Sequence, residues 1–219
     1  MCEPPPDTRT EALLLVDIQP DFMPAGALPV PAGDEILGPV GRLMQSGRFA
    51  VQVATQDWHP PDHVSFASQH DGRDPLTTMD YYGHTQMLWP DHCVQQTPGA
   101  RLHPDLPWEY VRAVIRKGME SDADSYSGFR NNWDPRGERP VTGLAGYLNE
   151  LGVKSVYVCG LARDVCALWT ALDAVEFGFH TFFIWDMTRA VDPESDDDTE
   201  SQLSEKKVKF VSADQMVGT

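Results

Sequence analysis

The sequence has little cysteine, and its cysteines lie far apart. The 219 residues include four, at positions 2, 93, 159 and 166, and no two of them form a CxxC pair. This spacing excludes a dense disulfide framework. It fits a reducing compartment, where a cysteine is more often catalytic or buried than disulfide-bonded.

Positive charge is also scarce. The 17 lysines and arginines are outnumbered by 33 aspartates and glutamates, which gives a net charge of −16. Such a chain is disfavoured as a partner of nucleic acid or of an anionic membrane surface. A neutral small molecule and a metal cation held by carboxylates remain as the partners to expect. The composition leaves open whether the chain forms a homo-oligomer.

Long apolar runs are absent. No stretch approaches the about 20 residues that a membrane-spanning helix needs. The opening residues, MCEPPPDTRT, lack the apolar core of a secretory signal. We therefore expect a cytoplasmic protein. Hydrophobic residues make up 41% of the chain, enough to fill a sizeable core. Because no internal repeat argues for two units, residues 1–219 are expected to form a single domain.

Short apolar segments alternate with amphipathic ones along the chain. The helical segments lie near Asp34–Ser46, Thr142–Leu151, Arg163–Phe177 and Asp198–Lys206. Six segments read as strands, and several are apolar throughout, as in parallel strands covered on both faces: Leu13–Val16, Phe49–Thr55, Val111–Arg116, Ser155–Gly160, Thr181–Trp185 and Lys207–Val211. This alternation predicts an α/β fold, doubly wound, with a mainly parallel six-stranded sheet and helices on both faces.

Two stretches depart from this alternation. The interval Trp58–Trp108 is rich in proline, glycine, histidine, aspartate and aromatics, with little periodicity. A stretch of that length inside a compact domain is usually functional, and we interpret it as an active-site excursion with short helical turns. The acidic run Asp192–Glu200 is interpreted as a solvated loop leading into a helix N-terminus, where acidic side chains suit the helix dipole.

Cys166 occupies a distinctive position in the segment VYVCGLARDVC, residues 156–166. A central strand pattern runs there directly into the start of a helical pattern, where backbone N–H groups and the helix dipole favour an anion. That placement predicts a thiol with a lowered pKa and hence a nucleophile. The alternative is a small buried apolar residue, the commonest role of a free cysteine.

Two charged residues also follow predicted strands. Asp17 comes after Leu13–Val16 and Lys117 after Val111–Arg116. Ligands of open α/β sheets bind outside the carboxyl ends of the strands, so Asp17, Lys117 and Cys166 are expected to meet in one crevice. A thiol that attacks a carboxamide needs a carboxylate to carry its proton, and a nearby ammonium favours the thiolate. Backbone N–H groups at the start of the Cys166 helix can stabilise the oxyanion.

A second cluster follows the strand Phe49–Thr55. Asp57 and His59 share one face of an extended chain, with His63 close by and His92 in the excursion. Carboxylate and imidazole together suit zinc, iron or manganese, and the absence of cysteine favours an exchangeable site over a structural zinc. The alternative is a polar loop that binds no metal.

These motifs together resemble the nicotinamidases of the isochorismatase-like cysteine hydrolase superfamily. The matching stretches span nearly the whole chain in the family's order: LLLVDIQPDFMPAGALPV (13–30), TQDWHPPDHVSFAS (55–68), LWPDHCVQQTPGARLHPDL (88–106), VIRKG (114–118), DSYSGF (124–129) and VCGLARDVC (158–166).

The resemblance implies a role for each matching residue. The catalytic triad is Asp17, Lys117 and Cys166, with the oxyanion held by the N–H groups of Ala162 and Cys166. A cis peptide commonly precedes the residue that matches Ala162. The remaining site residues fall into two sets: the metal ligands Asp57, His59 and His92, with His63 as a candidate for a further place, and the substrate-ring contacts Phe22, Trp89 and Tyr126.

The activity implied by the resemblance is hydrolysis of nicotinamide to nicotinic acid and ammonia, in NAD salvage. The cofactor implied is one divalent transition metal ion, Zn²⁺ first, with Fe²⁺ and Mn²⁺ as alternatives. Two other functions remain open: a related cysteine amidohydrolase acting on another small carboxamide, and a catalytically silent, metal-dependent binding protein of the same fold. The intact metal set disfavours the former, and the complete triad disfavours the latter.

Overall fold

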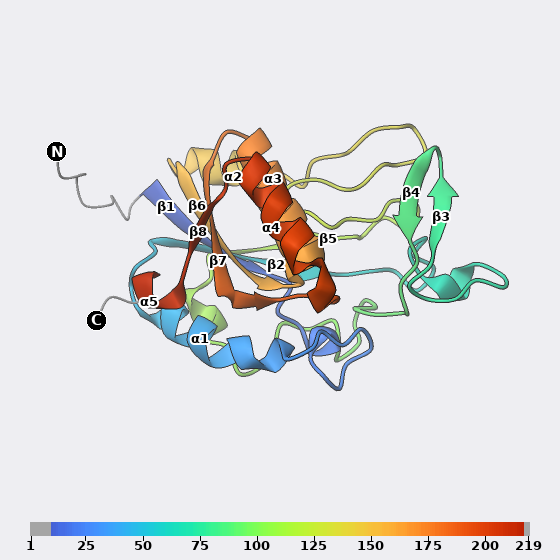
Figure 1. Cartoon of the computed structure of the whole chain (residues 1–219), viewed down its shortest axis with the longest axis horizontal. Coiled ribbons are helices and arrows are strands. Elements are labelled where there is room, and N and C mark those ends of the chain that lie inside the picture. The colour runs from blue at the N-terminus through green and yellow to red at the C-terminus, as the bar shows by residue number, and fades with distance from the viewer. Residues whose placement is uncertain (1–9, 217–219) are drawn as a thin grey trace.

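A computed structural model describes residues 10–216 of the chain, so Cys2 lies outside the described residues. Within that range, six parallel strands form one sheet in the order β5-β2-β1-β6-β7-β8 (Figure 1). Their bounds are β1 Glu11–Val16, β2 Val51–Asp57, β5 Ala113–Lys117, β6 Ser155–Leu161, β7 His180–Arg189 and β8 Lys209–Val211. The predicted doubly wound α/β fold is thereby confirmed, and the predicted strands differ only at their ends.

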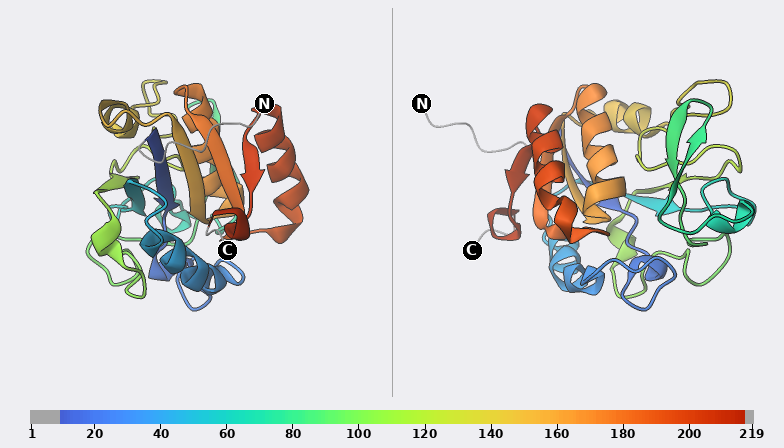
Figure 2. Two further views of the ribbon diagram at one scale, coloured as in Figure 1. Left: turned by 90° about the vertical axis from the view of Figure 1, so that its left-hand side faces the viewer. Right: turned by 45° about the vertical axis from the view of Figure 1, so that its right-hand side comes forward.

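Helices cover both faces of the sheet (Figure 2). Helix α1 (Leu37–Gln45) and the short α5 (Ala213–Met216) pack on one face, and the other face carries α2 (Leu144–Glu150), α3 (Leu168–Glu176) and α4 (Asp196–Glu205). Each face of the sheet has its own apolar core. Within β1, Leu13 and Leu15 belong to the core under α1, and Leu14 and Val16 to the core under α2, α3 and α4. The strand reads as a continuous apolar run because both of its faces are buried.

The structure corrects several predicted bounds. The helix predicted at Asp34–Ser46 begins as a 3-10 turn over Gly33–Ile36 before α1, and two further 3-10 turns, Pro20–Phe22 and Pro193–Ser195, lie in loops. The helix predicted at Arg163–Phe177 opens with a π-helical turn, Arg163–Ala167, before α3. The peptide bond between Leu161 and Ala162 is cis.

The excursion Trp58–Trp108 contains an element that its sequence pattern did not predict. Beside the short turns Ala67–Gln69 and Trp108–Tyr110, it forms an antiparallel hairpin of β3 (Thr78–Tyr81) and β4 (His84–Met87), which stands apart from the main sheet in Figure 1. Tyr82 and Gly83 connect the strands with φ of 51° and 82°. Positive φ at both positions is what a two-residue type I′ hairpin turn requires.

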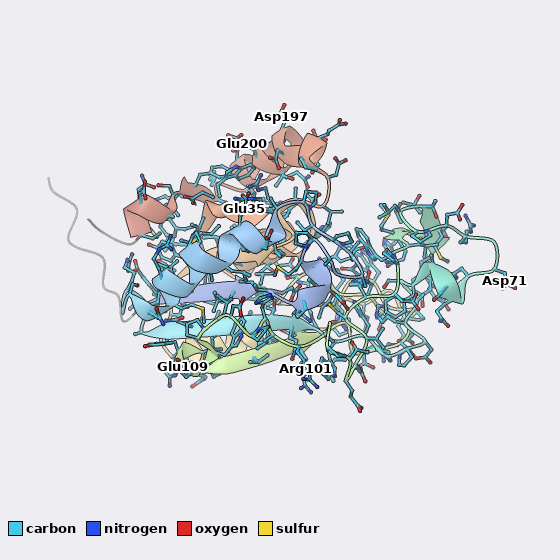
Figure 3. All side chains as sticks on the ribbon, turned by 90° about the horizontal axis from the view of Figure 1, so that it is seen from below. Glu35, Asp71, Arg101, Glu109, Asp197 and Glu200 are labelled. Carbon is cyan, nitrogen blue, oxygen red and sulfur yellow. The ribbon has the colours of Figure 1, made fainter. Side chains whose placement is uncertain are left out.

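The acidic surplus lies largely on the surface. Figure 3 shows Asp197 and Glu200 on α4, and Glu35 beside α1, projecting outward. The acidic run leads through a loop into the N-terminus of α4, as expected, and one of its members, Asp196, pairs with the Arg163 guanidinium through Oδ2 at 2.6 Å. Among the described residues, no helix combines the length and apolar character that crossing a bilayer requires.

Gly160 allows the two central strands to approach each other beside the candidate site. Its φ is +115°, and a Cβ there would lie 2.1 Å from the carbonyl oxygen of Val16. We expect Gly160→Ala to lower the free energy of unfolding by about 3–5 kcal/mol, because backbone strain and overpacking add. Denaturant unfolding followed by circular dichroism measures the loss.

Gly152→Ala is the matched control for this substitution. Gly152 also has a positive φ, 75°, but a Cβ there would meet nothing within 4 Å. It should cost only about 1–2 kcal/mol, the strain of a left-handed backbone. Equal losses in the two variants would show that the close approach of β1 and β6 has no energetic role.

Candidate active site

Four strand ends bring the candidate residues together. Asp57 and Lys117 are the last residues of β2 and β5 and face each other in the parallel register of those strands. Asp17 follows β1 directly, and Cys166 lies in the π-helical turn that follows β6. Because β5, β2, β1 and β6 are consecutive in the sheet, their carboxyl ends open into one crevice.

The ammonium of Lys117 lies at the centre of this crevice. Its side chain is buried, and its Nζ donates to Asp57 Oδ1 and to the Ser125 carbonyl oxygen, both at 2.8 Å. The same nitrogen lies 2.9 Å from Asp17 Oδ2 and 3.4 Å from the Cys166 sulfur. One cation therefore contacts two carboxylates and the thiol.

Asp17 is fixed in place by a neighbouring strand. The Thr55 hydroxyl, on β2, donates to Asp17 Oδ1 at 2.6 Å and accepts from the Asp17 backbone N–H at 3.2 Å. The aspartate has a left-handed φ of 46° and is fully buried. Its carboxylate is held between Thr55 and Lys117, and it is a hydrogen-bond partner of the Cys166 thiol.

The two carboxylates beside Lys117 have opposite pKa shifts. Burial raises the pKa of Asp17 above its usual value, although Lys117 opposes the shift. Burial would raise the pKa of Asp57 too, but His59 and Lys117 hold it well below its usual range. Burial would lower the pKa of Lys117, yet the two carboxylates raise it well above the usual lysine value. Asp57 therefore stays anionic, whereas Asp17 is the better proton acceptor of the two.

The predicted lowering of the thiol pKa is wrong. Burial raises the pKa of the Cys166 thiol well above its usual value, even though Lys117 favours the thiolate. The sequence pattern indicated a helix start and a nearby cation, but not the depth at which the sulfur lies. In this environment the resting group is a thiol, so an acceptor for its proton is required before it can attack.

The turn that carries Cys166 is anchored at its first two residues. Arg163 is buried, donates to Thr188 Oγ1 at 2.9 Å and to the Thr188 carbonyl at 2.8 Å, and pairs with Asp196. The Asp164 carboxylate accepts from the N–H groups of Val191 and Asp192, each at 2.9 Å. These contacts fix Cys166 against the loop after β7.

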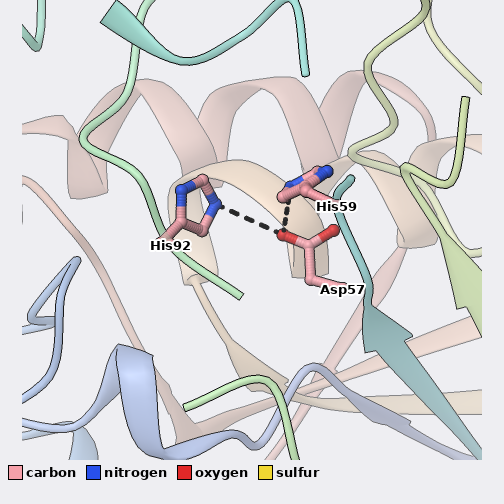
Figure 4. Close-up of side chains that lie close together, drawn as sticks. All are labelled: Asp57, His59 and His92. Carbon is pink, nitrogen blue, oxygen red and sulfur yellow. Dashed lines mark hydrogen bonds and ion pairs between the residues drawn. The ribbon is translucent and has the colours of Figure 1, made fainter. Parts of the chain in front are cut away.

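Asp57, His59 and His92 form a compact cluster next to Lys117 (Figure 4). Asp57 Oδ2 lies 3.1 Å from His59 Nε2 and 3.4 Å from His92 Nε2, while its other oxygen binds Lys117. All three residues are buried, and each offers one ligand atom within 4.8 Å of the other two.

The donor set of this cluster fits a metal ion. His59 Nδ1 lies 2.9 Å from the Gly118 carbonyl, and His92 Nδ1 lies 2.8 Å from the Pro90 carbonyl. A neutral imidazole whose Nδ1–H donates to a carbonyl turns a lone pair outward at Nε2. Two such lone pairs and a carboxylate oxygen then converge, which is unfavourable unless a cation lies between them.

His63 belongs to a neighbouring group rather than to this cluster. Its ligand atom groups with those of His59 and Asp124, and its ring centroid lies 4.0 Å from that of His59. Its Nδ1 bonds the Ser65 hydroxyl at 2.7 Å, whereas its Nε2 is buried without a hydrogen-bond partner. Burial lowers the pKa of His63 to about 3, so the ring is neutral and its unpartnered nitrogen remains a candidate ligand.

A small cavity of about 20 Å³ lies above Cys166. The rings of Phe22, Trp89 and Tyr126 line it, together with Ala162 and the metal cluster. The expected ring contacts, the cysteine and the metal ligands therefore border one space, and Lys117 contacts two of its lining residues, Asp57 and Cys166. The cavity joins a nucleophile to flat apolar walls, an arrangement suited to a small planar molecule with a carbonyl group.

Several residues of the site were not indicated by the sequence. Asp124 borders the cavity and accepts from Gln86, a side chain of the hairpin, at 2.7 Å. Gly118 follows Lys117 with φ +61°, and a Cβ there would lie 2.3 Å from the His59 ring. The stretches VIRKG and DSYSGF contain Gly118 and Asp124, but nothing in either pattern shows what these residues touch.

Comparisons with known proteins agree with this geometry. The chain is 43% identical over 181 residues to a nicotinamidase of Acinetobacter baylyi, covering 83% of this chain and 82% of that protein. Among solved structures, a nicotinamidase and pyrazinamidase of Acinetobacter baumanii has a TM-score of 0.88 at 39% identity, covering 95% and 98% of the two chains. A pyrazinamidase of Pyrococcus horikoshii in complex with zinc has a TM-score of 0.76 at 38% identity, covering 93% and 99%.

The family assignment rests on most of the chain. The family model described as the isochorismatase domain matches residues 11–215, which include every strand of the main sheet and every residue of the candidate site. The resemblance drawn from the sequence motifs is confirmed by this match and by the relatives. Because this match spans the whole sheet and the residues at its strand ends, the chain belongs to the isochorismatase family.

Proposed function

We propose that this chain is a metal-dependent amidase that hydrolyses nicotinamide to nicotinic acid and ammonia, through a thioester on Cys166. One observation carries the proposal: the buried Lys117 ammonium contacts both the Asp17–Cys166 pair and the carboxylate of the metal cluster, beneath a cavity walled by aromatic rings. The similarity to nicotinamidases indicates which small amide is the substrate.

Asp17 is proposed as the proton carrier. It accepts the proton of the Cys166 thiol as the sulfur attacks the carboxamide carbon and forms a C–S bond. Lys117 stabilises the thiolate during this step, because its ammonium lies 3.4 Å from the sulfur. Asp17 then donates the proton to the departing nitrogen, which leaves as ammonia when the C–N bond breaks. A water molecule attacks the thioester in turn, releasing nicotinic acid and restoring the thiol.

The backbone N–H groups of Ala162 and Cys166 are proposed to bind the oxyanion of each tetrahedral intermediate. Both residues border the cavity, at the turn that Arg163 and Asp164 anchor. Fixed backbone donors stabilise developing charge without reorganising during the reaction, and removal of one such donor typically costs about 10²–10³-fold in rate.

Asp57, His59 and His92 are proposed to hold one divalent ion, zinc first, and His63 is a candidate for a further place. Such an ion supplies a Lewis-acidic point that the ring nitrogen, or a water bound to it, can contact. The protein's own part is to hold the three ligands in place, through Lys117 on Asp57 and the carbonyls of Gly118 and Pro90 on the imidazoles.

Ammonia release from nicotinamide tests the proposed activity. The purified protein should release ammonia from nicotinamide, and Cys166→Ala should reduce turnover by at least about 10³-fold, because no thioester can form. Cys159→Ala is the matched control and should retain activity, since Cys159 is buried within β6, away from the cavity. Turnover of aliphatic amides with none of nicotinamide would refute the substrate assignment. Full activity of Cys166→Ala would refute the nucleophile.

Asp17→Asn tests the proton carrier. The amide keeps the size of the carboxylate but cannot accept the thiol proton, so turnover should fall by about 10²–10⁴-fold, the range of a lost general base. Alkylation of Cys166 by iodoacetamide across pH gives an independent readout: Asp17 raises the pKa of the thiol, so in Asp17→Asn the alkylation profile should move to lower pH. A variant with normal turnover and an unchanged alkylation profile would rule out proton transfer through Asp17.

Gly118→Ala tests the metal site without replacing a ligand. The new Cβ would collide with the His59 ring at 2.3 Å, so His59 should be displaced and the metal content of the purified protein should fall well below one ion per chain. Gly137→Ala is the control, because Gly137 has φ +75° and a Cβ there would meet nothing within 4 Å. Elemental analysis measures both. Equal metal content in the two variants would contradict the role of His59.

A further inference from the structure

The cavity above Cys166 is too small for the proposed substrate. Its volume of about 20 Å³ holds roughly one water molecule, since a single water needs about 10–15 Å³ of such space. A six-membered ring that carries a carboxamide is several times larger. A residue of the cavity wall must therefore move before a substrate can reach the sulfur.

A larger chamber lies on the other side of that wall. It has a volume of about 180 Å³, and Tyr126 is the one described residue that lines both it and the cavity above Cys166. We call this space the outer chamber. Aromatic rings make up most of its walls, with Tyr81 and His84 from the hairpin, and Trp133 and Trp169 from later segments of the chain. Drug-sized ligands occupy about 300–1,000 Å³, so the outer chamber suits a single ring.

Two rings of the outer chamber pack against each other, and a third lies between two indoles. His84 and Trp133 are stacked, with centroids 4.2 Å apart and planes within 4°. Tyr126 lies between two indoles, 6.3 Å from Trp89 on the inner side and 6.3 Å from Trp169 on the outer side. Trp133 is 40% exposed, so part of its ring surface is accessible to a ligand.

The charges around the outer chamber favour a neutral ligand. Arg139 supplies the one guanidinium of its lining, and Arg139 Nη2 lies 3.4 Å from the Asp173 carboxylate, so the charge is already paired. The lining also contains the amides of Gln86 and Asn132 and the hydroxyl of Thr85, which carry no charge. A chain of net charge −16 also repels anions.

The Tyr126 hydroxyl has a hydrogen bond with the Asp124 side chain and two longer contacts. The hydroxyl lies 3.3 Å from Trp89 Nε1 and 3.5 Å from Gln86 Nε2. Gln86 is the buried side chain of the hairpin strands, and it also donates to Asp124 at 2.7 Å. The two longer contacts are weak, so the bond with Asp124 is the main interaction of the hydroxyl that opening of the wall must break.

We propose that the outer chamber is a second binding site, which takes a neutral single-ring aromatic amide against Trp133 and delivers it past Tyr126 to Cys166. The identity of the ligand as nicotinamide rests on the proposed function. The proposal of a second binding site rests on the volume of the outer chamber, on the aromatic rings that line it and on Tyr126, which it shares with the cavity above Cys166. Trp133 and His84 bind the ring, and Tyr126 is the gate.

Binding at the outer chamber can be measured without catalysis. In ¹⁵N-labelled Cys166→Ala protein, the indole N–H signal of Trp133, assigned by its loss in Trp133→Ala, should shift as nicotinamide is added. Benzamide should shift it similarly, because stacking needs no ring nitrogen. If the Trp133 signal does not shift at millimolar ligand, the outer chamber is not a binding site, whether or not the wild-type protein hydrolyses nicotinamide. A shift in a protein that fails to hydrolyse nicotinamide would support the chamber and refute only the proposed activity.

Steady-state kinetics gives the second readout. Trp133→Ala should raise KM for nicotinamide by about two- to tenfold, the range of one lost ring–ring contact, with kcat unchanged. Phe210→Ala is the control: Phe210 is 37% exposed on the far edge strand β8 and borders neither space, so its KM should not change. A KM that is equal in the two variants would contradict the proposal.

The gate is tested without substrate. Tyr126→Phe keeps the ring and removes the hydroxyl that Trp89 and Gln86 contact. Alkylation of Cys166 by iodoacetamide should then be faster by about two- to tenfold, the worth of one hydrogen bond. Circular dichroism and the unfolding midpoint control for loss of structure. An alkylation rate equal to that of wild type in a folded variant would show that Tyr126 does not close the cavity.

Discussion

The ammonium of Lys117 is the interaction on which the rest of the site depends. Two carboxylates and a thiol are buried within contact of it. Transfer of an ion from water to a protein interior costs several kcal/mol even after relaxation, and it is offset only by a partner of opposite charge. Without this lysine, Asp17 and Asp57 would repel each other at the strand ends. The parallel register that sets Asp57 opposite Lys117 is therefore a constraint on the chemistry as much as on the fold.

The same constraint separates two tasks that carboxylates can perform. Asp17 and Asp57 share one ammonium, yet their pKa values shift in opposite directions because only Asp57 also faces imidazoles. One carboxylate is thereby suited to exchange protons and the other to remain an anion. Two imidazoles, each fixed by a backbone carbonyl, lie beside the anionic Asp57. Because both residues are aspartates, the difference between their pKa values comes from their neighbours.

The sequence predicts most of the fold and the positions of the site residues, for a physical reason. Buried parallel strands read as apolar runs, and polar residues directly after them must lie at one edge, so Asp17, Asp57 and Lys117 could be placed without coordinates. The hairpin escaped prediction because Thr78–Tyr81 and His84–Met87 are mostly polar and half-exposed, with no apolar face to reveal their period. The pKa of Cys166 was predicted in the wrong direction because burial depth is a property of packing. The contacts of Gly118 and Gln86 depend on segments far away in the chain.

The β3–β4 hairpin contributes no strand to the main sheet, yet it supplies Gln86 to the wall beside Tyr126. The groups proposed to react, by contrast, all come from the ends of sheet strands and the turn after β6. The molecule thus separates its reaction from its selectivity. Changes in length or sequence within residues 78–87 can alter which ligands are admitted while the sheet and the buried lysine stay intact. On such an architecture, related enzymes can acquire new substrates through a peripheral insertion, with no redesign of the machinery beneath it.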